Sequence, residues 1–190
     1  MISKKVICML GFLVLFSGMV FASDMSEAEQ LRKRCETEYV QINICVTNFG
    51  DAADKENLAK GEKMIKLAKV KMAQTKYPDS IALFNDYIKL QYALYASLAD
   101  KYLERTDMMM DEIAIELVDF IDNKKVDQYL KMASQNIKDA KSNKAQKYDK
   151  VAIDHCRTAK KYLLACYGAA GKAVPEQYKI DAADNNLKTL

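Results

Sequence analysis

The chain has 190 residues, half of them hydrophobic, with 29 basic and 26 acidic side chains and no tryptophan. Lysine alternates with aspartate and glutamate along most segments, so no continuous basic face is expected. Nucleic acid, which needs such a face, is therefore excluded as a partner. The length suits one domain of ordinary size.

The first 22 residues have the three parts of a secretory signal peptide. MISKK is basic, an unbroken apolar run follows it, and small residues surround Ala22. We therefore predict a signal peptide over residues 1–22 and a periplasmic or secreted mature protein without a membrane span. A membrane anchor is the alternative, but the run is shorter than the ~20 residues that cross a bilayer. Without Lys4 and Lys5 the basic residues fall to 27 against 26 acidic ones, a net charge of +1.

The mature chain favours helix almost throughout. It is rich in Ala, Lys, Leu and Met, and the whole sequence has only six glycines and two prolines. Apolar residues recur in alternating steps of three and four, which is typical of helices packed nearly parallel. We predict an all-α helical bundle of about five to six helices over residues 23–171, followed by a polar C-terminal tail over residues 172–190. Weak internal similarity leaves tetratricopeptide-like stacking as an alternative.

The first predicted helix begins at a capping box of Ser26 and Glu29 and ends at Gly50. Within it, residues 40–47 read VQINICVT, an alternation that also fits a β-strand. Helix is favoured, because no second strand exists to pair with this one. A second helix covers about residues 52–76.

A third helix begins at Asp79 or Ser80. Thr106 and Asp107 offer a new N-cap, so a fourth helix is predicted from there to about Asn123. Two further helices cover about residues 125–143 and 148–170.

The third helix carries more aromatic residues than one buried stripe can hold. If this helix lies at the edge of the bundle, Tyr87, Tyr95 and Tyr102 form an exposed aromatic strip beside Lys89 and Lys101. Tyrosines with basic neighbours are common in protein interfaces. We predict partial exposure, and hence a candidate partner surface. If the helix is central, these rings are core instead.

Four cysteines remain after the leader, in two pairs with the same nine-residue gap: Cys35 and Cys45, then Cys156 and Cys166. An even number in an exported chain predicts two disulfides. Ten residues of helix rise about 15 Å, and a disulfide tolerates about 7 Å between Cα atoms, so the bridges must cross between the two pairs. A four-thiolate zinc site is the alternative, but such ligands usually lie two to four residues apart.

The cysteine spacing resembles the twin C-x9-C helical hairpins of mitochondrial intermembrane-space proteins, in which two bridges staple antiparallel helices. The resemblance implies Cys35–Cys166 as one bridge and Cys45–Cys156 as the other, joining the first and last helices. That pairing requires a chain reversal near Thr106. The function of that family does not carry over, because only the cysteines match.

No catalytic signature is present, so we predict no enzyme activity, no cofactor and no metal. His155 is the only histidine and adjoins Cys156, which is expected to be oxidised. Three methionines, Met108 to Met110, could bind copper, but filling a core at a helix junction is favoured.

The segment LADKYLERTDMMMDEIAIELVDFIDNKKVDQYLKMASQNIKDAK, with HCRTAKKYLL after it, resembles the helical proteins that coat periplasmic flagellar filaments of spirochaetes. Membership would imply a structural role, binding to a filament and no cofactor. We therefore expect a non-catalytic structural or interaction protein of the bacterial cell envelope, with an envelope or filament protein as partner. A small-ligand-binding periplasmic helical carrier is the alternative.

Overall fold

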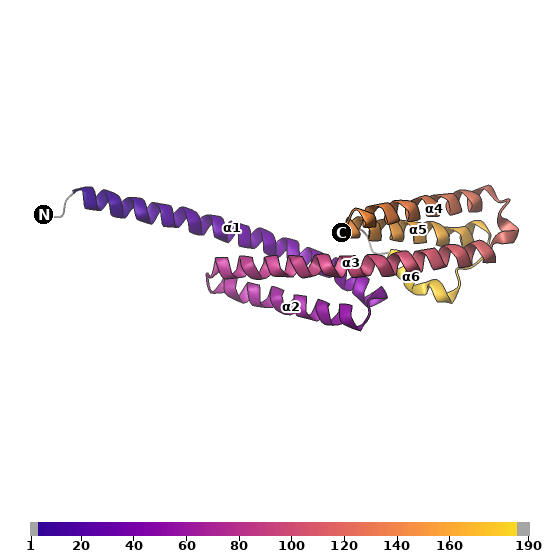
Figure 1. Ribbon diagram of the computed structural model, residues 1–190, viewed down its shortest axis with the longest axis horizontal. Coiled ribbons are helices and arrows are strands. Elements are labelled where there is room, and N and C mark those ends of the chain that lie inside the picture. Colours follow the sequence, from indigo (N-terminus) through magenta and orange to yellow (C-terminus); the bar gives the residue numbers. More distant parts are fainter. Residues whose placement is uncertain (1–3, 186–190) are drawn as a thin grey trace. The chain divides into compact units, whose positions relative to one another are not determined.

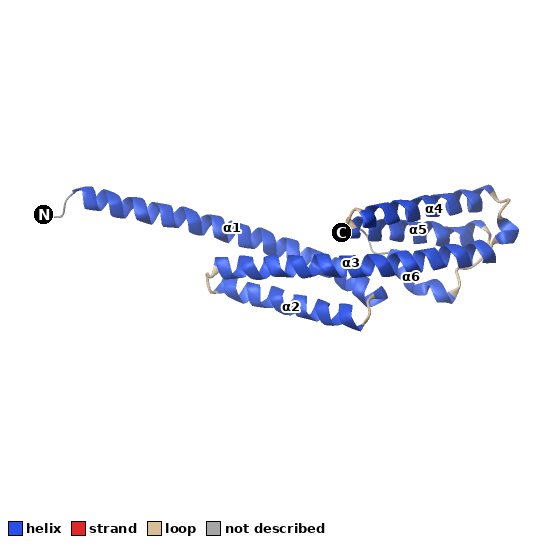
Figure 2. Ribbon diagram, viewed as in Figure 1, coloured by secondary structure: helices blue, strands red, loops and turns tan. Residues whose placement is uncertain are grey.

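The computed structural model describes residues 4–185, and the side chains of residues 23–184. Every regular element in this part of the chain is a helix (Figures 1 and 2). The α-helices are α1 (Lys4–Phe49), α2 (Ala52–Ala73), α3 (Tyr77–Glu116), α4 (Lys124–Ala145), α5 (Asp149–Ala169) and α6 (Lys179–Asn185), with 3-10 turns η1 (Val118–Phe120) and η2 (Glu176–Tyr178). The all-α prediction with about six helices is confirmed.

The helices form two compact units, unit 1 and unit 2. Unit 1 comprises Met1–Val40 and Ala59–Gln91, and unit 2 comprises Gln41–Leu58 and Tyr92–Leu190. The division falls inside α1, α2 and α3, so no loop marks it in the sequence.

Unit 1 has a small apolar core. Its buried members are Cys35, Ile65, Ala68, Phe84 and Tyr87. A glycine on α2 makes room for the largest of them, because a Cβ at Gly61 would come within 2.9 Å of a ring carbon of Tyr87. The missing side chain therefore allows a tyrosine ring to occupy the interior.

Unit 2 has a larger core, in which α4 packs against α5 and α5 against α6. Along α4 and α5 the apolar residues at steps of three and four are almost all buried. The core residues are Met109, Ile113, Leu117, Val126, Ala133, Ile137, Ala159, Leu163, Cys166, Tyr167 and Tyr178. Each large apolar side chain buried in this way contributes about 1.5–3 kcal/mol.

The predicted break at Thr106 is wrong, because α3 continues through it to Glu116. The hydroxyl of Thr106 is buried and donates to the carbonyl oxygen of Tyr102, 2.6 Å away. Such a bond to the preceding turn satisfies the hydroxyl inside a helix, so the residue does not cap a new one. Cysteine pairing that needs a reversal near Thr106 therefore lacks its geometric basis.

The predicted start at Ser26 is also wrong, because α1 runs through that residue. Glu29 does not reach back to the backbone but binds the Arg32 guanidinium at 2.6 Å. The end predicted at Gly50 is confirmed, and residues 40–47 are helical, as favoured.

The two later helices, α4 and α5, lie within about two residues of the predicted ranges 125–143 and 148–170. The Asn123 side chain accepts from the backbone nitrogen of Lys125 at 3.0 Å and thereby caps α4. After α5, Gly171 adopts a φ of 70° and the Lys172 nitrogen donates to the Tyr167 carbonyl at 2.8 Å. Glycine takes this left-handed conformation without steric cost, which is why the helix ends there.

The predicted signal peptide over residues 1–22 lies outside the residues whose side chains are described. Among the described residues, no helix has the length and hydrophobicity needed to span a membrane.

Candidate functional site

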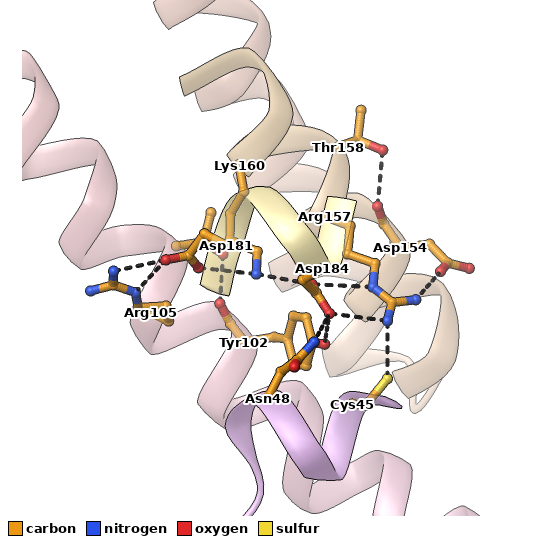
Figure 3. Close-up of polar contacts among 11 residues, drawn as sticks. Cys45, Asn48, Tyr102, Arg105, Asp154, Arg157, Thr158, Lys160, Asp181 and Asp184 are labelled. Atoms are coloured by element: carbon orange, nitrogen blue, oxygen red, sulfur yellow. Dashed lines mark hydrogen bonds and ion pairs between the residues drawn. The ribbon is translucent and has the colours of Figure 1, made fainter. Parts of the chain in front are cut away.

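The most polar part of the interior is a cluster around Lys160 in unit 2 (Figure 3). Lys160 is fully buried, and its Nζ lies 3.2 Å from Oδ1 of Asp181 and 3.1 Å from Oδ2 of Asp184. Both carboxylates are also buried. Here "the Lys160 cluster" means Asn48, Tyr102, Arg105, Arg157, Lys160, Asp181 and Asp184.

Helical spacing places these groups together. Lys160 belongs to the stripe of α5 that faces the interior, with Cys156 before it and Leu163 after it. Asp181 and Asp184 are three residues apart, so they share one face of α6. Burial of that face brings two carboxylates to one ammonium group.

Two arginines extend the ion pairs to either side of Lys160. Nη2 of Arg105 lies 2.8 Å from Oδ2 of Asp181, and Nη2 of Arg157 lies 3.3 Å from Oδ1 of Asp184. Each carboxylate therefore meets two cations. A buried charge without such partners would be strongly unfavourable.

Two neutral side chains also donate hydrogen bonds to the carboxylate of Asp184. The Tyr102 hydroxyl donates to its Oδ1 at 2.8 Å, and Nδ2 of Asn48 donates to the same atom at 3.0 Å. The Lys160 ammonium also lies 4.0 Å from the ring centroid of Phe49, a distance at which the ring attracts a cation.

The surroundings of Asp184 and Tyr102 shift the pKa values of both side chains. Burial alone would raise the pKa of Asp184, but the charges of Lys160 and Arg157 outweigh it, and the pKa is lowered. The pKa of Tyr102 is strongly raised, chiefly by burial, so its hydroxyl keeps its proton. At neutral pH the carboxylate of Asp184 is therefore ionised and accepts hydrogen bonds.

A second polar group joins the C-terminal segment to α3. The Tyr178 hydroxyl donates to Oε2 of Glu112 at 2.9 Å, and the Tyr167 hydroxyl donates to Glu116. The Arg105 guanidinium lies 5.5 Å from the centre of the Tyr178 ring. Within residues 172–184, part of the predicted polar tail, Tyr178 therefore helps to complete the interior of unit 2.

The predicted aromatic surface is wrong. Tyr87, Tyr95 and Tyr102 are all almost completely buried. Tyr87 packs on Gly61 in unit 1, whereas Tyr102 meets the Phe49 ring edge to face, with centroids 4.7 Å apart, in unit 2.

The two lysines of that predicted surface bind carboxylates. Lys89 is exposed and bonds Asp86 at 2.8 Å, one turn away on its own helix. Lys101 bonds both Asp51, at 2.6 Å, and Asp54 at the start of α2. Lys101 therefore helps to position a helix.

The four cysteines are free thiols in the structure, and all are buried. Sγ of Cys45 lies 3.3 Å from Nη2 of Arg157, and the next turn of α1 brings Phe49 to Lys160. Later residues of α1 therefore meet later residues of α5, as in parallel helices. The predicted bridges would instead require antiparallel helices. Neither bridge is formed, and the pairing stays a prediction.

The remaining candidates have ordinary environments. Met109 is buried and Met108 exposed, as expected for a core position beside a surface position. Nδ1 of His155 lies 3.1 Å from Oδ1 of Asn136. Among the described residues, no group of three or more His, Cys, Asp or Glu side chains could hold a metal ion.

Comparison of the chain with protein-family models, curated proteins and solved structures finds no match. The class that the fold defines is an all-α protein of two helical units. Chemically, the Lys160 cluster attaches a C-terminal helix to α3 and α5 through paired charges.

Proposed function

We propose that this chain is a non-catalytic structural or interaction protein of the bacterial cell envelope. It is exported by the leader over residues 1–22, and its partner is another protein of the envelope. The proposal combines the sequence of the leader with the chemistry of the Lys160 cluster.

The observation that supports a non-catalytic role is that each buried charge of the Lys160 cluster is paired with charges of opposite sign. The Lys160 ammonium binds two carboxylates, and each of these also binds an arginine. A general acid or base needs a proton that can be transferred at working pH. The lowered pKa of Asp184, caused by the charges of Lys160 and Arg157 against its burial, supports a permanently ionised, structural carboxylate.

A finer proposal is that the partner is a periplasmic flagellar filament. The support is the resemblance carried by residues 98–141, which form the end of α3, η1 and most of α4. The test is co-sedimentation of the purified protein with isolated periplasmic filaments. Protein that stays in the supernatant would contradict the filament role and leave the export proposal standing.

Export is tested by the N-terminus of the protein recovered from expressing cells. We expect a processed chain in the periplasmic fraction that begins at Ser23. Leu13→Arg, which places a charge inside the apolar run, should leave an unprocessed chain in the cytoplasm, whereas Leu13→Ile should be processed normally. An unprocessed wild-type chain would contradict the proposal.

The finer proposal for the cysteines is that Cys35, Cys45, Cys156 and Cys166 form two disulfides in the oxidising compartment; the pairs that the spacing implies would require α1 and α5 to pack in the opposite direction from the one observed. For the reduced protein we expect slow alkylation, because burial raises the pKa values of Cys35, Cys156 and Cys166 to about 11. At pH 8 the thiolate fraction should be at least about 100-fold below that of an unperturbed cysteine, and it should rise about tenfold per pH unit.

The measurement is the rate of iodoacetamide labelling, followed residue by residue with mass spectrometry. All four cysteines should label rapidly after denaturation of the reduced protein. Rapid labelling of the folded protein would contradict the buried thiols. In protein recovered without reductant, labelling of all four cysteines after denaturation would contradict the disulfides.

A further inference from the structure

Unit 2 carries an exposed apolar surface where α3 ends. Ile115 is 74% exposed and Val118 is 57% exposed. Asp111, one turn before Ile115, is also exposed, as are Asp119 and Asp122. We call these five residues the acidic surface. Large aliphatic side chains that are exposed and lie three residues apart in the sequence mark a candidate contact site.

The charge of the acidic surface is not balanced within the described part of the chain. Asp111, Asp119 and Asp122 have no ion-pair partner there. Residues 106–123 contain six acidic side chains and no basic one, and the nearest following bases are Lys124 and Lys125. A molecule that covers this surface should therefore bring apolar groups flanked by positive charge.

Unit 1 carries a surface with that chemistry on α2. Leu67 is 48% exposed and Val70 is 50% exposed, and the exposed residues Lys60 and Lys63 precede them on the same face. We call these four residues the basic surface.

The lysines of the basic surface are also unpaired. Among the described residues, Lys60 and Lys63 have no ion-pair partner. The neighbouring Lys66 differs, since it bonds Glu62 on its own helix at 2.7 Å. The two surfaces thus have opposite unbalanced charges around similar aliphatic pairs.

The residue spacing of the two surfaces is the same. A charged residue is followed by an aliphatic one after four positions and by another after three. On α2 this is the step of a helix-packing seam, whereas on α3 the helix ends at Glu116 and the second aliphatic residue, Val118, begins η1. When α2 of one chain aligns in parallel with the end of α3 of another, this register pairs Lys63 with Asp111 and Leu67 with Ile115. Val118, at the start of η1, follows at the end of the contact.

We propose that the acidic surface of one copy of this chain binds the basic surface of a second copy. The contact is heterologous, because it joins two different surfaces. A bound pair retains one unused surface of each kind, so further copies add head to tail until a ring closes or an open filament grows. This inference depends on neither export nor the identity of another partner.

The first test blocks one surface at a time in the chain purified from expressing cells. Leu67→Asp with Val70→Asp removes the apolar part of the basic surface, and Ile115→Asp with Val118→Asp removes that of the acidic surface. In sedimentation velocity, the wild-type mass should increase with concentration beyond the dimer. Each variant alone should be monomeric, and their mixture should give a 1:1 complex that grows no further. Circular dichroism should show that both variants keep their helix content.

The second test exchanges the charges of the proposed pair. Lys63→Asp and Asp111→Lys should each weaken association about tenfold, and combining them in one chain should restore it. Lys161→Asp makes the same charge change at an exposed site on α5 and should have little effect. The wild-type association should weaken at about 1 M salt, where the Debye length is about 3 Å.

Three results would overturn the proposal. The first is a wild-type mass that does not change with concentration, which would also result if the two surfaces met within one chain. The second is association of a variant with a blocked surface on its own, since this would mean that like surfaces bind each other. The third is a charge exchange that fails to restore association.

Discussion

Replacing Lys160 by methionine is expected to lower the free energy of unfolding by about 3 kcal/mol at neutral pH. Methionine fills a similar volume, but the change removes the cation shared by Asp181 and Asp184. Removing one partner of a buried ion pair leaves the opposite charge without compensation, which typically costs about 3–5 kcal/mol. The arginines that remain on both carboxylates place this estimate at the lower end.

The measurement is urea unfolding of wild type and variant, with Lys161→Met as the matched control. Lys161 is exposed and adjacent in sequence, so its replacement should change the stability by less than about 0.5 kcal/mol. Equal effects of the two substitutions would contradict a stabilising role of the cluster.

The effect of Lys160→Met should depend on pH in a defined direction. In the wild type the pKa of Asp184 is lowered because Lys160 and Arg157 outweigh its burial. Ionisation of Asp184 therefore stabilises the fold above its unfolded pKa, and this contribution is lost as the pH falls through the lower folded pKa. In the variant the charge of Lys160 no longer lowers the pKa of Asp184 against the effect of burial, so this carboxylate takes up a proton at higher pH. The stability difference between the two proteins should consequently shrink on acidification.

The second large effect is expected for Tyr178→Ala, which should lower the free energy of unfolding by about 3–5 kcal/mol. The Tyr178 side chain is completely buried, its ring lies 6.0 Å from that of Tyr167, and its hydroxyl binds Glu112. The substitution removes the ring and leaves a cavity in the core of unit 2.

Tyr148→Ala is the matched control, because the Tyr148 side chain is 58% exposed. Its loss should change the urea midpoint only slightly. A small effect of Tyr178→Ala would mean that the segment after Gly171 contributes little to unit 2, as expected for a polar tail.

The helical fold was predictable because its signals are local. Apolar residues at steps of three and four give the seams of α4 and α5, and Gly50 and Gly171 mark helix ends by their backbone chemistry. The predicted helix break at Thr106 was wrong because a threonine before an aspartate looks the same in the sequence in two situations. It can cap a new helix, or it can bond to the preceding turn of a continuing one. Its burial decides between these outcomes, and burial depends on residues distant in the sequence.

The Lys160 cluster was missed although the sequence holds a signal for it. Lys160 occupies an inward position of the α5 seam, between Cys156 and Leu163. A lysine at such a position needs a buried carboxylate, and Asp181 with Asp184 provides two on one helical face. The prediction of an exposed tyrosine surface was wrong for a related reason. It compared the number of rings on α3 with what one buried stripe can hold, and did not include the space that Gly61 leaves for a ring.

The order of the cluster residues along the chain has a consequence for synthesis. Lys160 precedes its carboxylate partners by 21 and 24 residues. Until the ribosome has added Asp184, the ammonium group has no complete set of partners, and moving it out of water is unfavourable. Because synthesis proceeds from the N-terminus, unit 2 can complete its fold only after this late segment has been added.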